Sequence, residues 1–243
     1  MAVPADTTGM KLALLFLAGC CAAAEAPAVR APILLELFTS EGCSSCPPAD
    51  RLLERFDSAQ PVSGADLIVL SEHVDYWNQL GWKDPFSSAK FSQRQRDYAE
   101  SFGGEVYTPE LVVDGAKGFV GSDEGEARRV IHDSLRAGKT PIRIEVNGGK
   151  ISLHLDRAVE GTLWLALAHD SMKSQVTRGE NAGRGLSHVA VVYSLEKVAK
   201  IGREATFSRE VSFTPHAGET TRIVAFVQKP EIGRVVALGQ VRM

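Results

Sequence analysis

The chain has 243 residues, of which 44% are hydrophobic and 23% are charged, a composition that is ordinary for a soluble globular protein. Its 27 lysines and arginines against 30 aspartates and glutamates give a net charge of −3. This lacks the basic excess of nucleic-acid-binding proteins, so no nucleic-acid partner is expected. The four cysteines form two close pairs, Cys20 with Cys21 and Cys43 with Cys46, which argues against a scattered disulfide scaffold.

Residues 1–30 are predicted to be a signal or lipoprotein peptide followed by a tether. Lys11 precedes a short apolar run at 12–18, a pattern typical of signal peptides and too short for a transmembrane helix. The sequence Leu-Ala-Gly-Cys that ends at Cys20 resembles the lipobox of bacterial lipoproteins, which implies lipidation of Cys20. The alternative is ordinary signal cleavage within residues 21–26. In both cases we expect a periplasmic or extracellular protein, with membrane contact only through the lipid.

Residues 31–138 are expected to form an α/β domain in which strands and helices alternate. Continuous apolar runs predict buried parallel strands, and apolar residues at helical spacing predict the helices. Asp114-Gly115 is a strong hairpin dipeptide. The predicted order is β-α-β-α-β-β-α, with strand 33–38, helix 49–58, strand 66–70, helix 87–102, strands 110–114 and 117–121, and helix 122–137.

The sequence Cys43-Ser44-Ser45-Cys46 lies at the first strand–helix junction. Unpaired N–H groups and the helix dipole at a helix start favour the thiolate, which is the form that attacks a disulfide. We therefore expect Cys43 to be the nucleophile and Cys46, about one turn later, to be the resolving thiol. The redox-active Cys43–Cys46 disulfide requires no dissociable cofactor, and its partners would be protein thiols or disulfides.

Thr108-Pro109 precedes the predicted strand 110–114 and resembles the X-Pro pair that thioredoxin-like proteins place opposite their active disulfide. The resemblance implies a cis peptide bond and a substrate groove in which Thr108 presents backbone groups to an extended substrate. The alternative is a trans proline in an ordinary turn.

The whole chain is similar to a family of secreted thioredoxin-like proteins of unassigned function. The resemblance covers essentially all of the mature protein and implies export and a thioredoxin-like fold for residues 31–138. It rests on E-G-C-S-S-C-P-P at 41–48, H-V-D-Y-W at 73–77, G-W-K-D-P-F at 81–86 and G-E-N-A-G-R at 179–184.

Further side chains are candidates for the same site because they lie near the ends of the first two predicted strands. Tyr76 and Trp77 would line the substrate groove, and Glu36, Glu41 or His73 would relay protons. The alternatives are an aromatic plug that packs a long loop and a histidine with a purely structural role. Strand alternation leaves open which face of the sheet Glu36 occupies.

Residues 139–243 are expected to form an all-β, sandwich-like second domain without a catalytic cluster, because the apolar period changes to two. The turn-rich loop 179–184 has two interpretations. Either Glu180 or Arg184 docks against the first domain or a ligand, or the loop is a solvated hairpin. The predicted strands are 141–146, 150–156, 162–168, 189–194, 206–213, 222–228 and 234–243.

The sequence thus favours an exported thiol–disulfide oxidoreductase that acts through its C-x-x-C site. One alternative is a periplasmic copper carrier using Cys43, Cys46 and His73, His169 or His188, since thiolates suit Cu(I). No metal site is assigned, because a second C-x-x-C or an H-x-x-x-H is missing from the sequence. The other alternative is a non-catalytic binding module that keeps an inert disulfide.

Overall fold

The computed structural model describes residues 1–5, 30–203, 206–213 and 220–243. The predicted lipidation site Cys20 and the alternative cleavage run lie outside these residues. Within the described ranges, no helix combines the length and apolar character that a membrane crossing needs.

The first half of the chain alternates strands and helices at the predicted positions, with ends that differ by a few residues. Proline in the first turn starts α1, and the side chain of Ser88 caps α2 by accepting from the backbone N–H of Lys90. The elements are β1 (Ala31–Thr39), α1 (Pro47–Ala59), β2 (Ala65–His73), α2 (Ala89–Phe102), β3 (Glu110–Val113), β4 (Lys117–Val120) and α3 (Glu124–Ser134).

The second half consists of strands, and each predicted strand overlaps an observed one. Two of them, β8 and β9, are much longer than predicted and form a hairpin whose register shifts at Leu163/Trp164 and at Leu167/Ala168. The elements are β5 (Thr140–Pro141), β6 (Arg143–Asn147), β7 (Lys150–Leu155), β8 (Gly161–Gln175), β9 (Gly185–Ile201), β10 (Phe207–Ser212), β11 (Thr221–Lys229) and β12 (Arg234–Arg242).

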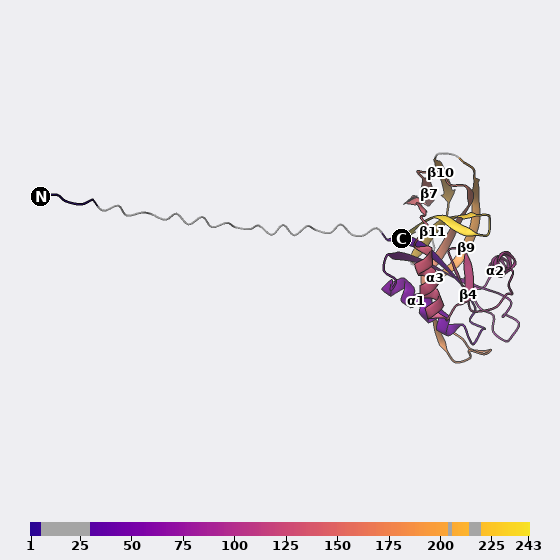
Figure 1. The fold of residues 1–243 in the computed structure, drawn as a ribbon. Coiled ribbons are helices and arrows are strands. Elements are labelled where there is room, and N and C mark those ends of the chain that lie inside the picture. Colours follow the sequence, from indigo (N-terminus) through magenta and orange to yellow (C-terminus); the bar gives the residue numbers. More distant parts are fainter. Residues whose placement is uncertain (6–29, 204–205, 214–219) are drawn as a thin grey trace.

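The predicted fold class, a thioredoxin-like domain followed by a separate β-sandwich, is wrong. Nine strands from both halves form one mixed sheet in the order β4-β3-β1-β2-β9-β8-β11-β12-β5 (Figure 1). The join is a parallel pairing of β2 with β9 at Ser71 and Val191, which covers an edge of β2 that would otherwise be open. Only β6, β7 and β10 form a second, three-stranded sheet. Apolar periodicity locates strands but does not say which edges pair.

The two halves share their main hydrophobic core. Leu35 and Phe56 of the first half and Trp164 and Phe226 of the second belong to one cluster of buried side chains. A second cluster lies between the three-stranded sheet and the large sheet, where Leu153 packs with side chains such as Leu165.

Strand β1 places its side chains alternately on the two faces of the large sheet. Glu36 and Phe38 contact α2, through an ion pair with Arg94 and a ring contact with Tyr98. Helices α1 and α3 lie together, apart from α2, joined by an ion pair of 2.8 Å between Arg55 and Glu124 (Figure 1). The end of β1 and the start of α1 thus form a junction that β9 also approaches.

Candidate redox site

A disulfide joins Cys43 and Cys46, whose Cα atoms are 5.4 Å apart. The residues between β1 and α1 form consecutive turns, and the Cys46 N–H donates to the Cys43 carbonyl at 3.2 Å. Helix α1 begins at Pro47, so Cys46 occupies the N-cap position and Cys43 precedes the helix. The expectation that Cys43 lies at a helix start is therefore corrected, because proline is favoured at the first helical position and sets the start at Pro47.

Both cysteines are completely buried, with 0% of their surface exposed, whereas Ser44 and Ser45 between them are exposed. The serine turn therefore forms the outer surface of the site, and the sulfur atoms lie beneath it. Attack on either sulfur requires this turn or its neighbours to move.

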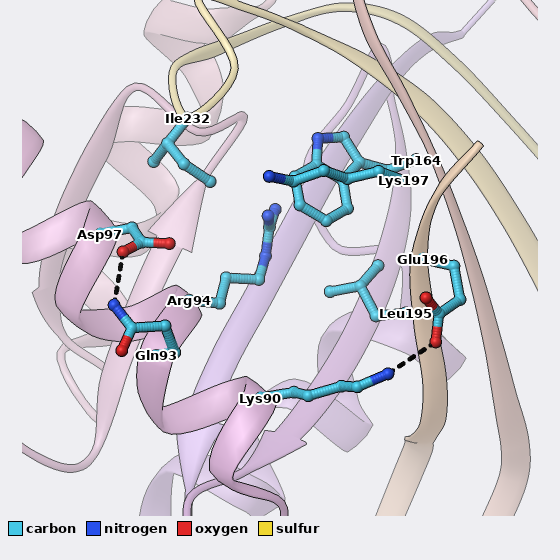
Figure 2. A pocket seen from close by; sticks show the side chains of 9 residues that line it. All are labelled: Lys90, Gln93, Arg94, Asp97, Trp164, Leu195, Glu196, Lys197 and Ile232. Atoms are coloured by element: carbon cyan, nitrogen blue, oxygen red, sulfur yellow. Dashed lines mark hydrogen bonds and ion pairs between the residues drawn. The ribbon is translucent and has the colours of Figure 1, made fainter. Parts of the chain in front are cut away.

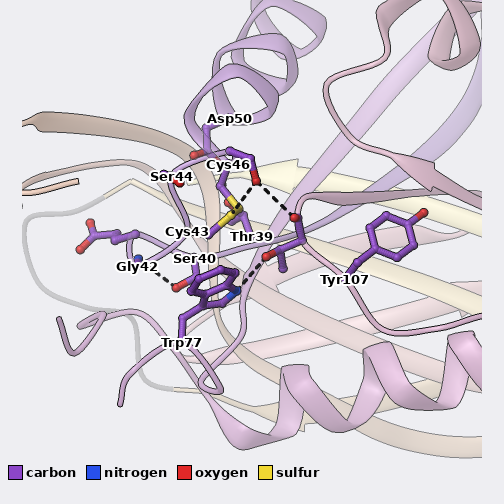
Figure 3. Close-up of a disulfide and its surroundings, with 12 residues drawn as sticks. Thr39, Ser40, Gly42, Cys43, Ser44, Cys46, Asp50, Trp77 and Tyr107 are labelled. Atoms are coloured by element: carbon purple, nitrogen blue, oxygen red, sulfur yellow. Dashed lines mark hydrogen bonds between the residues drawn. A yellow bond between two sulfur atoms is a disulfide. The ribbon is translucent and has the colours of Figure 1, made fainter. Parts of the chain in front are cut away.

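The Thr108–Pro109 peptide bond is cis, as predicted, and Thr108 lies at the disulfide. The Ser45 hydroxyl is 3.3 Å from Cys43 Sγ and donates to the Thr108 carbonyl at 3.4 Å. On the other side of Thr108, Trp77 Nε1 donates to its Oγ1 at 2.8 Å (Figure 3). The structure thus brings Thr108 to the cysteine turn, with Trp77 bound to its side chain and Pro109 next to it in the chain.

Tyr76, the other predicted groove residue, interacts with both Thr108 and α2, and a hydrogen bond to the Thr108 side chain acts to lower the pKa of its hydroxyl. Its hydroxyl donates to Gln95 of α2 at 3.1 Å, and burial raises the pKa of the phenol to about 12. Tyr76 and Trp77 therefore remain neighbours, with ring centroids 6.5 Å apart, and both interact with Thr108.

Glu41 is fully buried two residues before Cys43 and contacts both halves of the chain. Trp82 Nε1 donates to Glu41 Oε2 at 2.8 Å, and the Ser174 hydroxyl of β8 donates to Oε1. His188 Nε2 of β9 lies 3.4 Å from the same Oε1. The predicted relay residue Glu41 is thus at the site, but partners from the second half hold its carboxylate.

His188 lies between two carboxylates. Besides Glu41, its ring faces Asp50 of α1, with 3.7 Å between Nδ1 and Oδ2. Both separations are ion-pair distances and neither contact has hydrogen-bond geometry. Burial acts to lower the pKa of His188, but Asp50 and Glu41 outweigh it and raise the pKa to about 10. The two acidic neighbours therefore favour the protonated form of the His188 ring.

His73 lies beside this cluster, with its ring centroid 4.6 Å from that of His188. Its Nδ1 pairs with Asp84 Oδ2 at 2.7 Å, and the Glu41 N–H donates to the same oxygen at 2.8 Å. Burial acts to raise the pKa of Asp84, but His73 and two backbone N–H groups hold it below its usual range. His73 is thus a second buried histidine behind the cysteines, and Asp84 is its partner.

The loop between β8 and β9 docks onto the cysteine turn, as one of the two sequence alternatives expected. Asn181 Nδ2 donates to the carbonyls of Glu41 and Cys43 at 2.8 and 2.9 Å. Glu180 accepts from the Ser44 N–H at 3.1 Å, and hydrogen bonding by Ser44 lowers the pKa of the Glu180 carboxyl. Arg184 binds Asn181 within the loop.

Glu36 is not part of this site. It faces α2, where Arg94 binds it at 2.5 and 2.8 Å and the Tyr98 hydroxyl donates to it at 2.6 Å. Arg94 also lines a cavity of about 350 Å³ between α2 and the strands β8 and β9, which Figure 2 shows. The guanidinium is already held by Glu36 and packed over Trp164, so we place the chemistry at the disulfide and not in this cavity.

Sequence reasoning missed Asp50 and Ser174 and considered His188 only as a metal ligand. A signal was present for two of them. Asp50 shares the buried face of α1 with Leu53, and His188 directly precedes the apolar run Val189–Val192 of β9. Across the described parts of the chain, no group of three or more His, Cys, Asp or Glu residues is arranged to hold a metal ion.

Fold and site define a mostly β protein, built on a mixed nine-stranded sheet, that encloses a C-x-x-C disulfide between its first and second halves. The chain belongs to the family described as "Protein of unknown function (DUF1223)", whose profile matches residues 34–228. This confirms the expected membership in a family of unassigned function, but it does not support the thioredoxin-like part of that expectation.

Among solved structures, the chain is similar to the X-ray structure of protein AGR_C_4864 from Agrobacterium tumefaciens. The two share 26% identity with a TM-score of 0.69, over 87% of this chain and 94% of that one. A solution structure of CsgH from R. palustris matches at 13% identity and a TM-score of 0.17, over 42% of this chain and 89% of that one, and we infer nothing from it. None of the curated proteins matches the chain.

Proposed function

We propose that this protein is an exported thiol–disulfide oxidoreductase whose Cys43–Cys46 disulfide exchanges with the thiols of partner proteins. The observation that carries the proposal is the buried ionisable cluster of Glu41, Asp50 and His188 around the disulfide. A structural disulfide needs no charged surroundings, and burying charges is unfavourable, so their concentration here favours a reactive site. Export is proposed from the apolar run after Lys11, with Cys20 as the lipidated residue.

Cys43 is assigned as the residue that forms the mixed disulfide, because its sulfur lies next to Ser45 in the exposed turn. Cys46 resolves that intermediate from the N-cap of α1, where the helix dipole stabilises a thiolate. The Thr108 backbone beside the turn is the surface along which an extended partner segment would bind. Partner binding would displace Ser45 from Thr108 and expose the sulfur beneath.

The second candidate is a binding module with an inert disulfide, and the complete burial of both cysteines favours it. The two candidates differ in the reduction potential of the disulfide. An inert disulfide is expected below about −300 mV, where disulfides resist reduction by the glutathione pool, and a reactive one above it.

The test measures the reduction potential and the rate of insulin reduction for the wild type, Cys43→Ser and Cys46→Ser. We expect measurable turnover in the wild type, complete loss in Cys43→Ser, and a trapped mixed disulfide in Cys46→Ser, because only Cys43 remains to react. Absence of exchange in the wild type, with a potential below that limit, would establish the inert module instead.

A further inference from the structure

We propose that Glu41, His188 and Asp50 form a proton path between the buried cysteines and a solvent cleft that lies between α1 and β9. The inference rests on the proposed function and assigns to the second half of the chain a part in the redox step. The three residues are proton-transfer and positioning residues, since none is proposed to contact the partner protein.

The path begins at the cysteine turn. Asn181 binds the Glu41 and Cys43 carbonyls together, which fixes the acid relative to the first cysteine. At the other end, the Asp50 N–H donates to the Cys46 carbonyl at 3.1 Å. Figure 3 shows the side chain of Asp50 among the surroundings of the disulfide. The backbone of each cysteine is therefore fixed relative to the backbone of one of the two acidic residues, and His188 lies between their carboxylates.

Asp50 connects the cluster with solvent. It is 4% exposed and lines a cleft of about 180 Å³, whose other walls include Glu54 of α1 and Leu186 and Ser187 of β9. The Thr39 hydroxyl holds the other carboxylate oxygen at 2.8 Å, so the orientation of Asp50 is fixed. A proton taken up in the cleft thus reaches His188 through a single fixed carboxylate.

Reduction of a sealed disulfide requires such a path. A partner thiolate attacks Cys43 Sγ, the bond between Cys43 and Cys46 breaks, and Cys46 leaves as a thiolate. Cys46 then takes a proton from the cluster, which recovers one from the cleft. A second partner thiolate attacks the partner's own sulfur in the mixed disulfide and releases Cys43. In sum, the partner dithiol is oxidised to a disulfide and gives two electrons to the cysteines. Its two thiol protons pass to solvent when the thiolates form, Cys46 is protonated through the cluster, and the released Cys43 thiolate takes its proton from solvent at the opened turn.

The surroundings make His188 the proton donor. Glu41 of the cysteine loop and Asp50 of α1 face its ring. The ring of His73 in β2 also faces it, and Asp84 pairs with His73. The two adjacent carboxylates keep the imidazole protonated throughout the neutral range, which agrees with its raised pKa of about 10. A small rotation of the ring brings either nitrogen into hydrogen-bond contact with its carboxylate.

The test follows reduction of the oxidised protein by dithiothreitol between pH 6 and 9, with rates divided by the thiolate concentration of the reagent. We expect a level profile for the wild type, because the cluster supplies the proton. In His188→Gln the normalised rate should fall as pH rises and be at least tenfold lower at pH 8. Asp50→Asn should show the same loss, and the double variant should be no slower than either single variant, because both interrupt one path.

Because His188→Gln leaves two buried carboxylates without a counter-charge, a triple variant, Glu41→Gln with His188→Gln and Asp50→Asn, removes the path and the charges together. His154→Gln in the three-stranded sheet is the matched control and should keep the level profile. A level profile in the folded triple variant would overturn the proton path while leaving the oxidoreductase intact. A wild type that does not exchange at all would instead refute the proposed function.

Discussion

Arg94 is a buried cation held by charges and aromatic rings on the α2 side of the sheet. Its guanidinium binds Glu36 and lies 4.8 Å from the Trp164 ring centroid. Burial acts to lower the pKa of Arg94, but Glu36, Tyr98 and Glu72 outweigh it and raise the pKa above its usual value. Glu72, enclosed beside it, has a pKa well above its usual range because of burial and the neighbouring Glu36. The pKa values of Arg94 and Glu72 therefore depend on each other and on the neighbouring Glu36.

Replacing Arg94 by methionine is expected to lower the free energy of unfolding by about 3–5 kcal/mol, because Glu36 remains buried without its counter-charge. Urea unfolding at pH 7 measures the change. The double variant Arg94→Met/Glu36→Gln, which removes both charges, should recover a large part of the loss. Equal stability of the single and double variants would show that the ion pair is not what holds this region.

At the level of single residues, the sequence identified the cysteines, Trp77, Thr108 and Glu41 correctly as neighbours, because all lie near strand ends or beside the motif. It did not place Glu36, since the face of a strand residue depends on where the strand lies in the sheet. Asp50 was missed because a carboxylate in the first turn of a helix has an ordinary explanation in the helix dipole.

Among the elements, β3 and α2 meet through a carboxyl group that is poorly solvated. Glu110 is 3% exposed, and Gln95 donates to it at 2.8 Å. Burial raises its pKa to about 7, and the hydrogen bond from Gln95 only partly opposes this. The native state therefore binds a proton at this site that the unfolded chain releases at lower pH.

This shift has a defined sign in the stability of the protein. Since the folded pKa lies above the unfolded value of 4.5, the stabilisation is complete below pH 4.5 and is lost as pH rises through about 7. Glu110→Gln removes the ionisation, so its free energy of unfolding should exceed that of the wild type by about 1–3 kcal/mol at pH 8. Thermal or urea unfolding at pH 5 and pH 8 measures this, and an equal difference at both values would contradict it.

The positions of helices and strands followed from apolar spacing, but the length of the β8–β9 hairpin did not. Its distal part carries polar residues such as Lys173 and Ser174, which hide the strand pattern. That part supplies Ser174 and His188 to the cysteines, so the same failure concealed the back of the site.

Across the whole molecule, contacts between the halves go beyond the shared sheet. Gln228 of β11 donates to the Tyr98 hydroxyl, and Lys139 pairs with Asp114 at 2.6 Å, with both side chains buried. Arg222 of β11 binds Asp57 of α1. Strand pairing between distant segments is the property that local sequence patterns express least, which explains why the separate-sandwich prediction failed.

We therefore expect the two halves to unfold in one cooperative transition. Variants that keep only Trp77 or only Trp164, with the other tryptophans changed to phenylalanine, report on the cysteine side and on the large sheet respectively. For each variant, urea unfolding followed by tryptophan fluorescence and by circular dichroism should give the same midpoint and the same slope. Two separated midpoints in the same variant, one by fluorescence and one by circular dichroism, would show independent units.

The register shifts in the β8–β9 hairpin have a consequence for changes in chain length. Adjacent residues of a strand face opposite sides, so sliding β9 by one position against β8 would point Ser187 or Val189 at the cysteines and turn His188 outward. Both shifts leave one residue of β9 out of the strand register, Val198 and Tyr193, and thus set which face of the hairpin His188 occupies. Losing one residue there would remove His188 from the carboxylates of Glu41 and Asp50 while leaving the covalent structure of the C-x-x-C loop unchanged.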